Sequence, residues 1–415
     1  MQKIRLILLY ILAAVIVVVL GGAVGWYFFL HVPQTRNDTI DAARGLGVSI
    51  ASFTGGSTQD NIRTIVSGGS TSTSATSSSP LWQVDKAPVA GMNFVKRATS
   101  TTIDYVQRAN GYVFRADPVQ KSVVRVTETL MPKIYDAVIS PNGSVLARSL
   151  DGSGFITTFT ATVGATTSKT STSTAKNSLN GTYLEKGIRQ VVSSPTTQSI
   201  FYLIPNTTGG IDGLTAPWNG LKPKKVFSST ITHWIPLWLS DGRLIITESA
   251  VDDLPGYAYR VENDGTMTLL VGNVPGLTFL PHASSKAILY GSSSGGTLTL
   301  FAQGAASTTP TALSIQTIAD KCVWLDGKSL IAYCAVPTTP PKGRFLDQWY
   351  RGVIHTSDTW WKIDVQNGIV LEMYSPKHSD GVDLDVERPI IDPTGNYITF
   401  INTSDKSLWM LKITQ

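Results

Sequence analysis

From Leu81 to the C-terminus, the chain repeatedly alternates apolar with polar residues over stretches of about four to eight positions. Successive side chains of a β-strand point to opposite faces, so this alternation predicts many short strands, each with one buried face. The clearest unit is Lys133–Asp151, where two such stretches flank the turn sequence Ser-Pro-Asn-Gly. A turn between two alternating stretches predicts a β-hairpin.

Weaker copies of this hairpin recur at intervals of about 41 to 66 residues, the spacing of β-propeller blades that carry insertions. Several copies have a related turn sequence, such as Ser-Asp-Gly or Asp-Pro-Thr-Gly, at the same point. The last copy ends one strand short, whereas Leu81–Val84 is an unpaired strand ahead of the first. Pairing these two ends would close a ring and hide its free edges. The count favours seven blades, with six or eight as alternatives. The copies begin near Gly91, Lys133, Ile188, His233, Leu277, Cys322 and Arg388.

Leu6–Leu30 is an uninterrupted run of 25 uncharged, mostly apolar residues. As a helix it would be roughly 37 Å long, enough to cross a hydrocarbon layer of ~30 Å. Lys3 and Arg5 precede it, which predicts a cytoplasmic N-terminus and an extracytoplasmic remainder, periplasmic or at the cell surface. The alternative is a cleaved signal peptide, but the run is too long and no cleavage site follows it. Residues 1–31 are therefore predicted to be an N-terminal signal-anchor.

Residues 32–80 are rich in Ser, Thr and Gly. Such a composition buries too little apolar surface to offset the conformational entropy of the chain, so a flexible linker is predicted. The chain then divides into an anchor, a linker and a propeller over residues 81–415. A similar Ser/Thr-rich stretch, Gly164–Asn180, is predicted to be a solvated loop within the second blade.

The turns Ser140–Gly143 and Asp392–Gly395, each followed by an alternating strand, resemble the repeats of the TolB and WD-repeat-like propeller superfamily. The Gly-His and Trp-Asp pairs typical of WD repeats are missing. The resemblance covers nearly all of residues 81–415 and implies the fold; such rings host many unrelated activities, so it implies no single function. With the predicted anchor, the chain also resembles uncharacterised membrane-anchored propeller proteins of bacteria.

Composition agrees with an all-β fold. Charged residues make up 15% of the chain, and Ser, Thr and Gly are plentiful, whereas helices favour Glu, Lys, Ala and Leu. The net charge is +5, but Lys3, Arg5 and Arg36 flank the predicted anchor and leave 31 basic against 29 acidic residues elsewhere. Because no basic stripe is present, nucleic acid is not an expected partner.

Cys322 and Cys334 are the only cysteines, and they lie symmetrically about a hairpin turn at Asp326-Gly327. Opposed residues of paired strands have Cα atoms within disulfide reach, and an extracytoplasmic location favours oxidation. A disulfide is therefore predicted, the alternative being two reduced, buried cysteines. Two cysteines without histidines at ligand spacing predict no zinc site, and no cofactor is expected.

The best candidate binding region is the insertion Pro337–Thr359 in the sixth blade. It concentrates aromatic, arginine and acidic side chains, and aromatic and arginine residues dominate recognition hot spots. The alternative is that Trp349 and Tyr350 cover the apolar surface of the blade while the charges solvate the loop. The candidate residues are Arg344, Asp347, Trp349, Tyr350, Arg351, His355 and Asp358.

Three further groups are weaker candidates. Asp383, Asp385 and Glu387 would share one side of an extended strand, where their oxygens suit calcium, although solvated acids are the simpler interpretation. Gly291–Gly295 has the form G-x-S-x-G but lies between two predicted strands, which indicates a hairpin loop instead of a nucleophile elbow. His233 and His282 fall on inner strands and are expected to be core or channel-lining residues.

The predicted function is therefore a membrane-anchored, non-enzymatic propeller of the cell envelope that binds a protein or an envelope polymer. The alternative is a hydrolase or lyase with its site in the central channel. Such an enzyme needs paired carboxylates or a metal cluster there. The inner strands offer few acids besides Asp136 and Asp392, so the non-enzymatic function is favoured.

Overall fold

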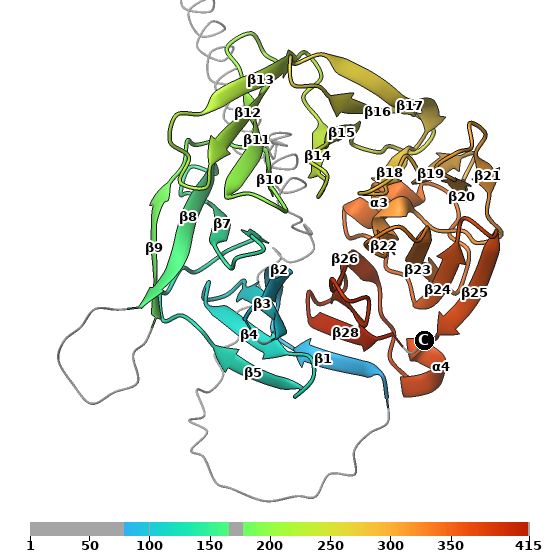
Figure 1. The fold of residues 1–415 in the computed structure, drawn as a ribbon, viewed down its shortest axis with the longest axis horizontal. Coiled ribbons are helices and arrows are strands. Elements are labelled where there is room, and N and C mark those ends of the chain that lie inside the picture. The colour runs from blue at the N-terminus through green and yellow to red at the C-terminus, as the bar shows by residue number, and fades with distance from the viewer. Residues whose placement is uncertain (1–78, 99, 166–176, 414–415) are drawn as a thin grey trace, which may run out of the picture. The chain divides into compact units, whose positions relative to one another are not determined.

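The computed structural model describes residues 79–98, 100–165 and 177–413. They form seven four-stranded antiparallel sheets arranged around a common centre, a seven-bladed β-propeller (Figure 1). The predicted all-β fold and the count of seven blades are confirmed. The predicted anchor, residues 1–31, lies outside the described residues, and within the described part no helix is long and apolar enough to cross a membrane.

The blades follow one another in sequence, and the strands of each are given in chain order. Blade 1 consists of β2 (Val89–Lys96), β3 (Thr101–Gln107), β4 (Val113–Asp117) and β5 (Ser122–Arg125). Blade 2 consists of β6 (Asp136–Ile139), β7 (Val145–Leu150), β8 (Ile156–Ala165) and β9 (Asn177–Tyr183). Blade 3 consists of β10 (Gln190–Ser193), β11 (Ser199–Pro205), β12 (Ile211–Pro217) and β13 (Lys224–Ser229). Blade 4 consists of β14 (Trp234–Trp238), β15 (Leu244–Glu248), β16 (Pro255–Val261) and β17 (Met267–Pro275).

Blades 5 to 7 follow the same plan and include three short helical segments. Blade 5 consists of β18 (Thr278–Pro281), β19 (Ile288–Ser294), β20 (Thr297–Gln303) and β21 (Thr311–Ala312). Blade 6 consists of β22 (Cys322–Trp324), β23 (Ile331–Pro337), β24 (Asp358–Asp364) and β25 (Ile369–Tyr374), and blade 7 of β26 (Val386–Ile391), β27 (Tyr397–Asn402), β28 (Leu408–Lys412) and β1 (Leu81–Asp85). The helical segments are η2 (Ala319–Lys321), α3 (Phe345–Tyr350) and α4 (Pro376–Asp380).

The ring closes as the sequence predicts. Strand β1 pairs antiparallel with β28, with Leu81 opposite Leu411 and Gln83 opposite Trp409. The first strand of the domain thus completes the last blade and removes two free sheet edges. The chain enters the propeller at the outside of blade 7 and moves directly to the inner strand β2 of blade 1.

The turns that revealed the repeat connect the first and second strands of their blades. In blade 2, Gly143 has a φ of 87° and its N–H donates to the Ser140 carbonyl at 2.9 Å. In blade 7, Gly395 has a φ of 72°, and the Asp392 carboxylate accepts from the backbone N–H of Tyr397 at 2.6 Å. Glycine tolerates the positive φ, and the Ser or Asp side chain satisfies exposed backbone donors, which is why this turn sequence recurs.

Each pair of neighbouring blades shares an apolar core formed by the faces of their sheets. Between blades 6 and 7, for example, Trp360 is fully buried and its ring centroid lies 5.3 Å from that of Phe400. Between blades 1 and 2, the inner strands approach so closely that a Cβ on Gly91 would lie 2.0 Å from the Ala137 carbonyl oxygen. The apolar side of each alternating strand pattern therefore packs against a neighbouring blade all around the ring.

Two predicted loops are shorter than expected. In the stretch Gly164–Asn180, β8 continues to Ala165 and β9 begins at Asn177, with Gly164 opposite Ser178. Within Gly291–Gly295, β19 continues to Ser294, and the turn is Gly295-Gly296, both with positive φ. In both cases small polar residues are compatible with an edge or exposed strand face, so composition alone overestimated the loop.

Candidate functional site

The insertion of blade 6 lies between β23 and β24 and contains α3 (Figure 1). Phe345, Leu346 and Trp349 form the buried side of this short helix. They pack against Leu298 of blade 5 and Ile318, which precedes η2. The apolar spacing of i, i+1 and i+4 gives the helix one buried face, so the insertion is folded onto blades 5 and 6.

Beneath α3 lies a buried ionic group that we call the sealed cluster: Lys321, Asp358 and Asp385. The Lys321 ammonium lies 2.5 Å from Asp358 Oδ2 and 2.6 Å from Asp385 Oδ1. All three side chains are at most 1% exposed. The ammonium also donates to the Thr356 hydroxyl at 2.8 Å. An ammonium has three protons, so Lys321 has no donor left for a ligand.

The cluster connects the insertion to the neighbouring blade. Trp349 Nε1 donates to Asp385 Oδ1 at 2.9 Å, and His355 Nδ1 lies 3.1 Å from Asp385 Oδ2. The Lys321 ammonium lies 5.0 Å from the centre of the Trp349 ring, a cation–π distance. Asp385 immediately precedes β26 of blade 7. Its carboxylate therefore fixes α3, through Trp349, and the segment after α3, through His355, to blade 7.

Burial and pairing act differently on the two carboxylates. Burial raises the pKa of Asp358 above its ordinary value, because Lys321 only partly offsets it and Asp385 is a like charge nearby. For Asp385 burial acts in the same direction, but Lys321 and the hydrogen bonds from Trp349 and Thr356 outweigh it and lower its pKa. Asp385 is therefore the ionised partner of Lys321, and their charges are paired within the protein.

The structure brings together three of the seven predicted residues. Trp349, His355 and Asp358 meet at the sealed cluster. Tyr350 is partly buried and its hydroxyl donates to Asp320 at 2.6 Å, while burial and this carboxylate raise its pKa. Trp349 is 5% exposed, which favours the alternative interpretation that it covers the apolar surface of the blade. Its ring packs the loop against the blades, as the alternative proposed.

The other predicted residues remain at the surface. Arg344 is 66% exposed and pairs with Asp347, whose backbone N–H donates to Asp252 of blade 4 at 3.0 Å. From Arg344 onward, the insertion exposes five side chains of mixed chemistry. We call this the insertion face: Arg344, Gln348, Arg351, Val353 and His355.

Sequence reasoning did not identify Lys321, Asp320 or Asp252 as parts of this region. Lys321 directly precedes Cys322, at the start of an inner strand, and a lysine at such a position is ordinarily solvated. Its partners Asp358 and Asp385 are 37 and 64 residues away. Only the ring topology brings these segments together, so no local signal in the sequence could have paired them.

The three acidic residues that were the weak calcium candidate have different partners. Asp383 pairs with Lys377, Asp385 with Lys321, and Glu387 with Lys406 at 2.7 Å. Three different lysines neutralise the three carboxylates, so their oxygens do not converge. Across the described residues, no group of three His, Cys, Asp or Glu side chains is arranged to hold a metal ion.

The acidic residues of the inner strands also have hydrogen-bond partners within the protein. Asp136 accepts from Arg148 at 2.8 Å and from Arg388 at 2.9 Å. Burial alone would raise the pKa of Asp136, but Arg388 and Arg148 lower it overall. Asp392 accepts from backbone N–H groups of its own turn. Asp136 is thus held by two arginines and Asp392 by its own turn.

The surroundings of the remaining candidate residues indicate a structural role. Buried His282 lies 3.3 Å from the Ser329 carbonyl and edge-on to Trp324 of blade 6, and burial lowers its pKa. His233 is exposed beside Thr232 at 3.0 Å. Ser293 of the G-x-S-x-G sequence is a buried strand residue that donates to Asp252, so it is not placed as a nucleophile.

Cys322 and Cys334 lie directly opposite each other in the β22–β23 pair, as the symmetric spacing predicts. Their Cα atoms are 4.0 Å apart, and the two sulfurs are joined. Cys322 follows Lys321 directly, so the disulfide fixes the strand that begins at the sealed cluster.

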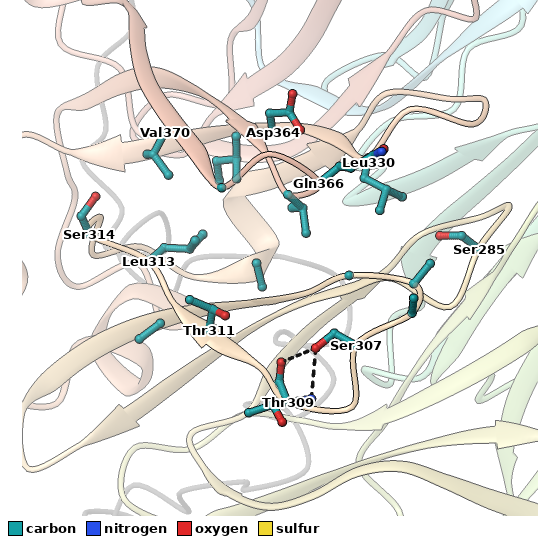
Figure 2. A pocket seen from close by; sticks show the side chains of 18 of the residues that line it. Ser285, Ser307, Thr309, Thr311, Leu313, Ser314, Leu330, Asp364, Gln366 and Val370 are labelled. Carbon is teal, nitrogen blue, oxygen red and sulfur yellow. Dashed lines mark hydrogen bonds between the residues drawn. The ribbon is translucent and has the colours of Figure 1, made fainter.

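A cavity of about 860 Å³ opens between blades 5 and 6 (Figure 2). Leu313, Leu330 and Val370 line it together with hydroxyl residues, and Ser307 donates to the Thr309 carbonyl at 2.8 Å. Its one acid, Asp364, accepts from the side chain and backbone of Asn367. The lining of the cavity mixes small aliphatic and hydroxyl side chains with Lys328 and Asp364.

No protein-family model matches the chain, and no curated protein is significantly similar to it in sequence. Solved propellers resemble it in fold. A virginiamycin B lyase from Staphylococcus aureus gives a TM-score of 0.48 at 13% identity, covering 80% of this chain and 99% of its own.

Two further propellers give similar values. The propeller domain of the trilobed protease from Pyrococcus furiosus, described as having an open velcro topology, gives 0.47 at 8% identity over 78% of this chain and 95% of its own. The Cps50 (Swd1) propeller domain from Myceliophteria thermophila gives 0.43 at 8% identity, over 78% and 100%. At these identities the similarity concerns the fold alone.

Proposed function

We propose that the protein is a non-enzymatic binding module of the cell envelope that engages a protein or an envelope polymer through the insertion face. One observation carries the proposal: a buried ionic clamp holds a short helix on the blades and leaves Gln348, Arg351 and Val353 exposed beside it. Rigid presentation of mixed polar and apolar side chains lowers the entropic cost of association. Val353 is 61% exposed, so the insertion also presents an apolar side chain to solvent.

The chemistry of the acids supports binding over catalysis. Lys321 donates all its protons internally, and Asp136 and Asp392 are engaged by arginines and by backbone N–H groups. A general acid or base must be within reach of a substrate proton. These groups are instead used to hold blades and turns together.

The proposal places the propeller outside the cytoplasmic membrane, held by the predicted anchor Leu6–Leu30. The charge pattern around that segment and the joined cysteines support this location. Its test is alkaline extraction of membranes together with antibody access to a C-terminal epitope in spheroplasts. Release by alkali, or an epitope reached only after lysis, would contradict the location.

Contact at the insertion face can be tested by photo-crosslinking in cells. A photoreactive residue replaces Val353 in the full-length chain, and a matched control replaces Leu221, which is 63% exposed in a loop of blade 3. We expect a discrete crosslinked band for a protein partner, or a smear for a polymer, from position 353 only. Adding Arg351→Glu should weaken that product. Equal products from positions 353 and 221, or none from either, would refute the proposal.

A further inference from the structure

A second, smaller cavity of about 280 Å³ lies between blades 1 and 2. Blade 1 contributes Arg97, which follows β2, and Arg115 of β4. Blade 2 contributes the Ser-Pro-Asn-Gly turn and parts of β8 and β9. We call it the arginine cavity; its lining is Arg97, Arg115, Val126, Asn142, Gly143, Ser144, Thr162, Val163 and Asn177.

One buried carboxylate orients both arginines. Asp104 has a side chain that is 1% exposed, and it accepts from Arg115 Nε at 2.9 Å and from Arg115 Nη2 at 3.0 Å. Arg97 Nη2 donates to the same carboxylate. The guanidinium groups are thereby held in place, while the two arginine side chains remain 31% and 30% exposed.

Donors remain unused after these bonds. Each guanidinium has five N–H groups, and Asp104 accepts two from Arg115 and one from Arg97. Arg97 Nε is buried and finds no acceptor within the described part of the chain. The Asn142 carbonyl oxygen accepts from Ser144 N–H at 3.2 Å, which leaves the amide nitrogen as a further donor. An unpaired buried N–H is unfavourable, and the further N–H groups of the two partly exposed arginine side chains are the donors that a ligand can reach.

The charge around the cavity is positive. Two guanidinium groups face one carboxylate, and neither Asp nor Glu is among the residues that line the space. The Arg97 guanidinium also lies against the turn of blade 2, since a Cβ on Gly143 would be 3.4 Å from its Nη2. Both blades therefore contribute polar side chains to the lining of one small volume.

We infer that the arginine cavity binds a small oxyanion, a phosphate or carboxylate group, between blades 1 and 2. The planar fork of arginine matches both groups in a bidentate manner. A volume of about 280 Å³ admits such a group with a short substituent and is below the usual range for larger ligands. The alternative is a salt bridge that serves only to stabilise blade 1.

The test is titration calorimetry on the full-length chain at low ionic strength, with inorganic phosphate and, separately, with malonate. We expect saturable binding of at least one of them. Binding of phosphate alone would identify the ligand as a phosphoryl compound, and binding of malonate alone would identify a carboxylate. Both preferences support the inference; absence of saturable binding of either anion overturns it.

Variants separate this site from adventitious anion binding. Arg97→Gln keeps the Asp104–Arg115 pair and should weaken binding about tenfold or more, because a charged hydrogen-bond donor is lost. Thr162→Glu leaves all three charged groups in place but adds a negative charge to the lining, and it should abolish binding, whereas the neutral Thr162→Gln should not. Arg260→Gln removes an exposed pair with Glu262 in blade 4 and serves as the matched control. If Arg97→Gln and Thr162→Glu both bind as the unmodified chain does, the anion lies elsewhere and the inference fails.

Discussion

The sealed cluster and the arginine cavity are built from the same kinds of charge with opposite arrangements. In the first, one ammonium is shared by two carboxylates, and all three side chains are at most 1% exposed. In the second, one carboxylate is shared by two arginines whose side chains remain about 30% exposed. Lys321 has no proton left to donate, whereas Arg97 and Arg115 have several.

The comparison teaches which buried charges hold a fold together and which can meet a ligand. A cation whose donors are all used inside the protein contributes only to structure, however unusual its environment. A cation oriented by a buried partner but still reaching solvent keeps donors for another molecule. Asp136 is intermediate, because it binds Arg148, which is 1% exposed, and Arg388, which is 50% exposed.

The largest effect is expected from Lys321→Met. It leaves Asp358 and Asp385 buried without a counter-charge, and breaking a buried pair in this way costs about 3–5 kcal/mol of the free energy of unfolding. Urea unfolding followed by tryptophan fluorescence measures it. The control is Lys377→Met, whose partner Asp383 is 55% exposed and whose loss should leave the unfolding midpoint unchanged. Similar midpoints for the two variants would show that the cluster is not a clamp.

Next in size is the disulfide. Cys322 and Cys334 are 12 residues apart, and a loop of that length corresponds to about 3 kcal/mol of unfolded-state entropy. The double variant Cys322→Ala and Cys334→Ala should lose about that much stability, and alkylation of the denatured, unreduced chain should find no free thiol. Quantitative labelling of both cysteines without reductant would show that they are reduced in the native protein.

A pH profile tests the intermediate case, Asp136. Its pKa is lowered from the ordinary value of 3.8, so the folded state binds fewer protons than the unfolded state below that pH. The stabilisation is fully present above 3.8 and is lost as the pH falls through the folded-state pKa. Thermal unfolding should therefore show Asp136→Asn less stable at neutral pH, with the difference in stability narrowing as the pH is lowered into the acid range. A gap that is constant with pH would mean that Asp136 is not ionised in the fold.

The sequence predicted the architecture because the repeat is local. Alternation, the Ser140–Gly143 and Asp392–Gly395 turns and the unpaired Leu81–Val84 all lie within single hairpins or at the chain ends. The disulfide spacing is equally local, since Cys322 and Cys334 flank one turn. Each of these features requires only the period of a strand and the geometry of a turn.

The charged clusters could not be predicted in the same way. Lys321 meets Asp385 from 64 residues away, and Arg388 meets Asp136 from 252 residues away. The contacts depend on which blades become neighbours and on the depth of each side chain. Trp349 shows the same limit: the sequence left open whether it binds a partner or covers the blade, and its burial depends on neighbours in space, Leu298 and Ile318.

The smallest effect on stability belongs to the arginine cavity itself. Arg97→Gln should cost no more than about 1 kcal/mol of the free energy of unfolding, because Asp104 keeps its two hydrogen bonds to Arg115. Arg115→Gln should cost more, since it removes both of them from a buried carboxylate. The two variants compared by urea unfolding, without added phosphate, measure the difference. If Arg97→Gln were as destabilising as Lys321→Met, the two clusters would have the same structural role. Arg97 would then stabilise the fold instead of being available to bind a ligand.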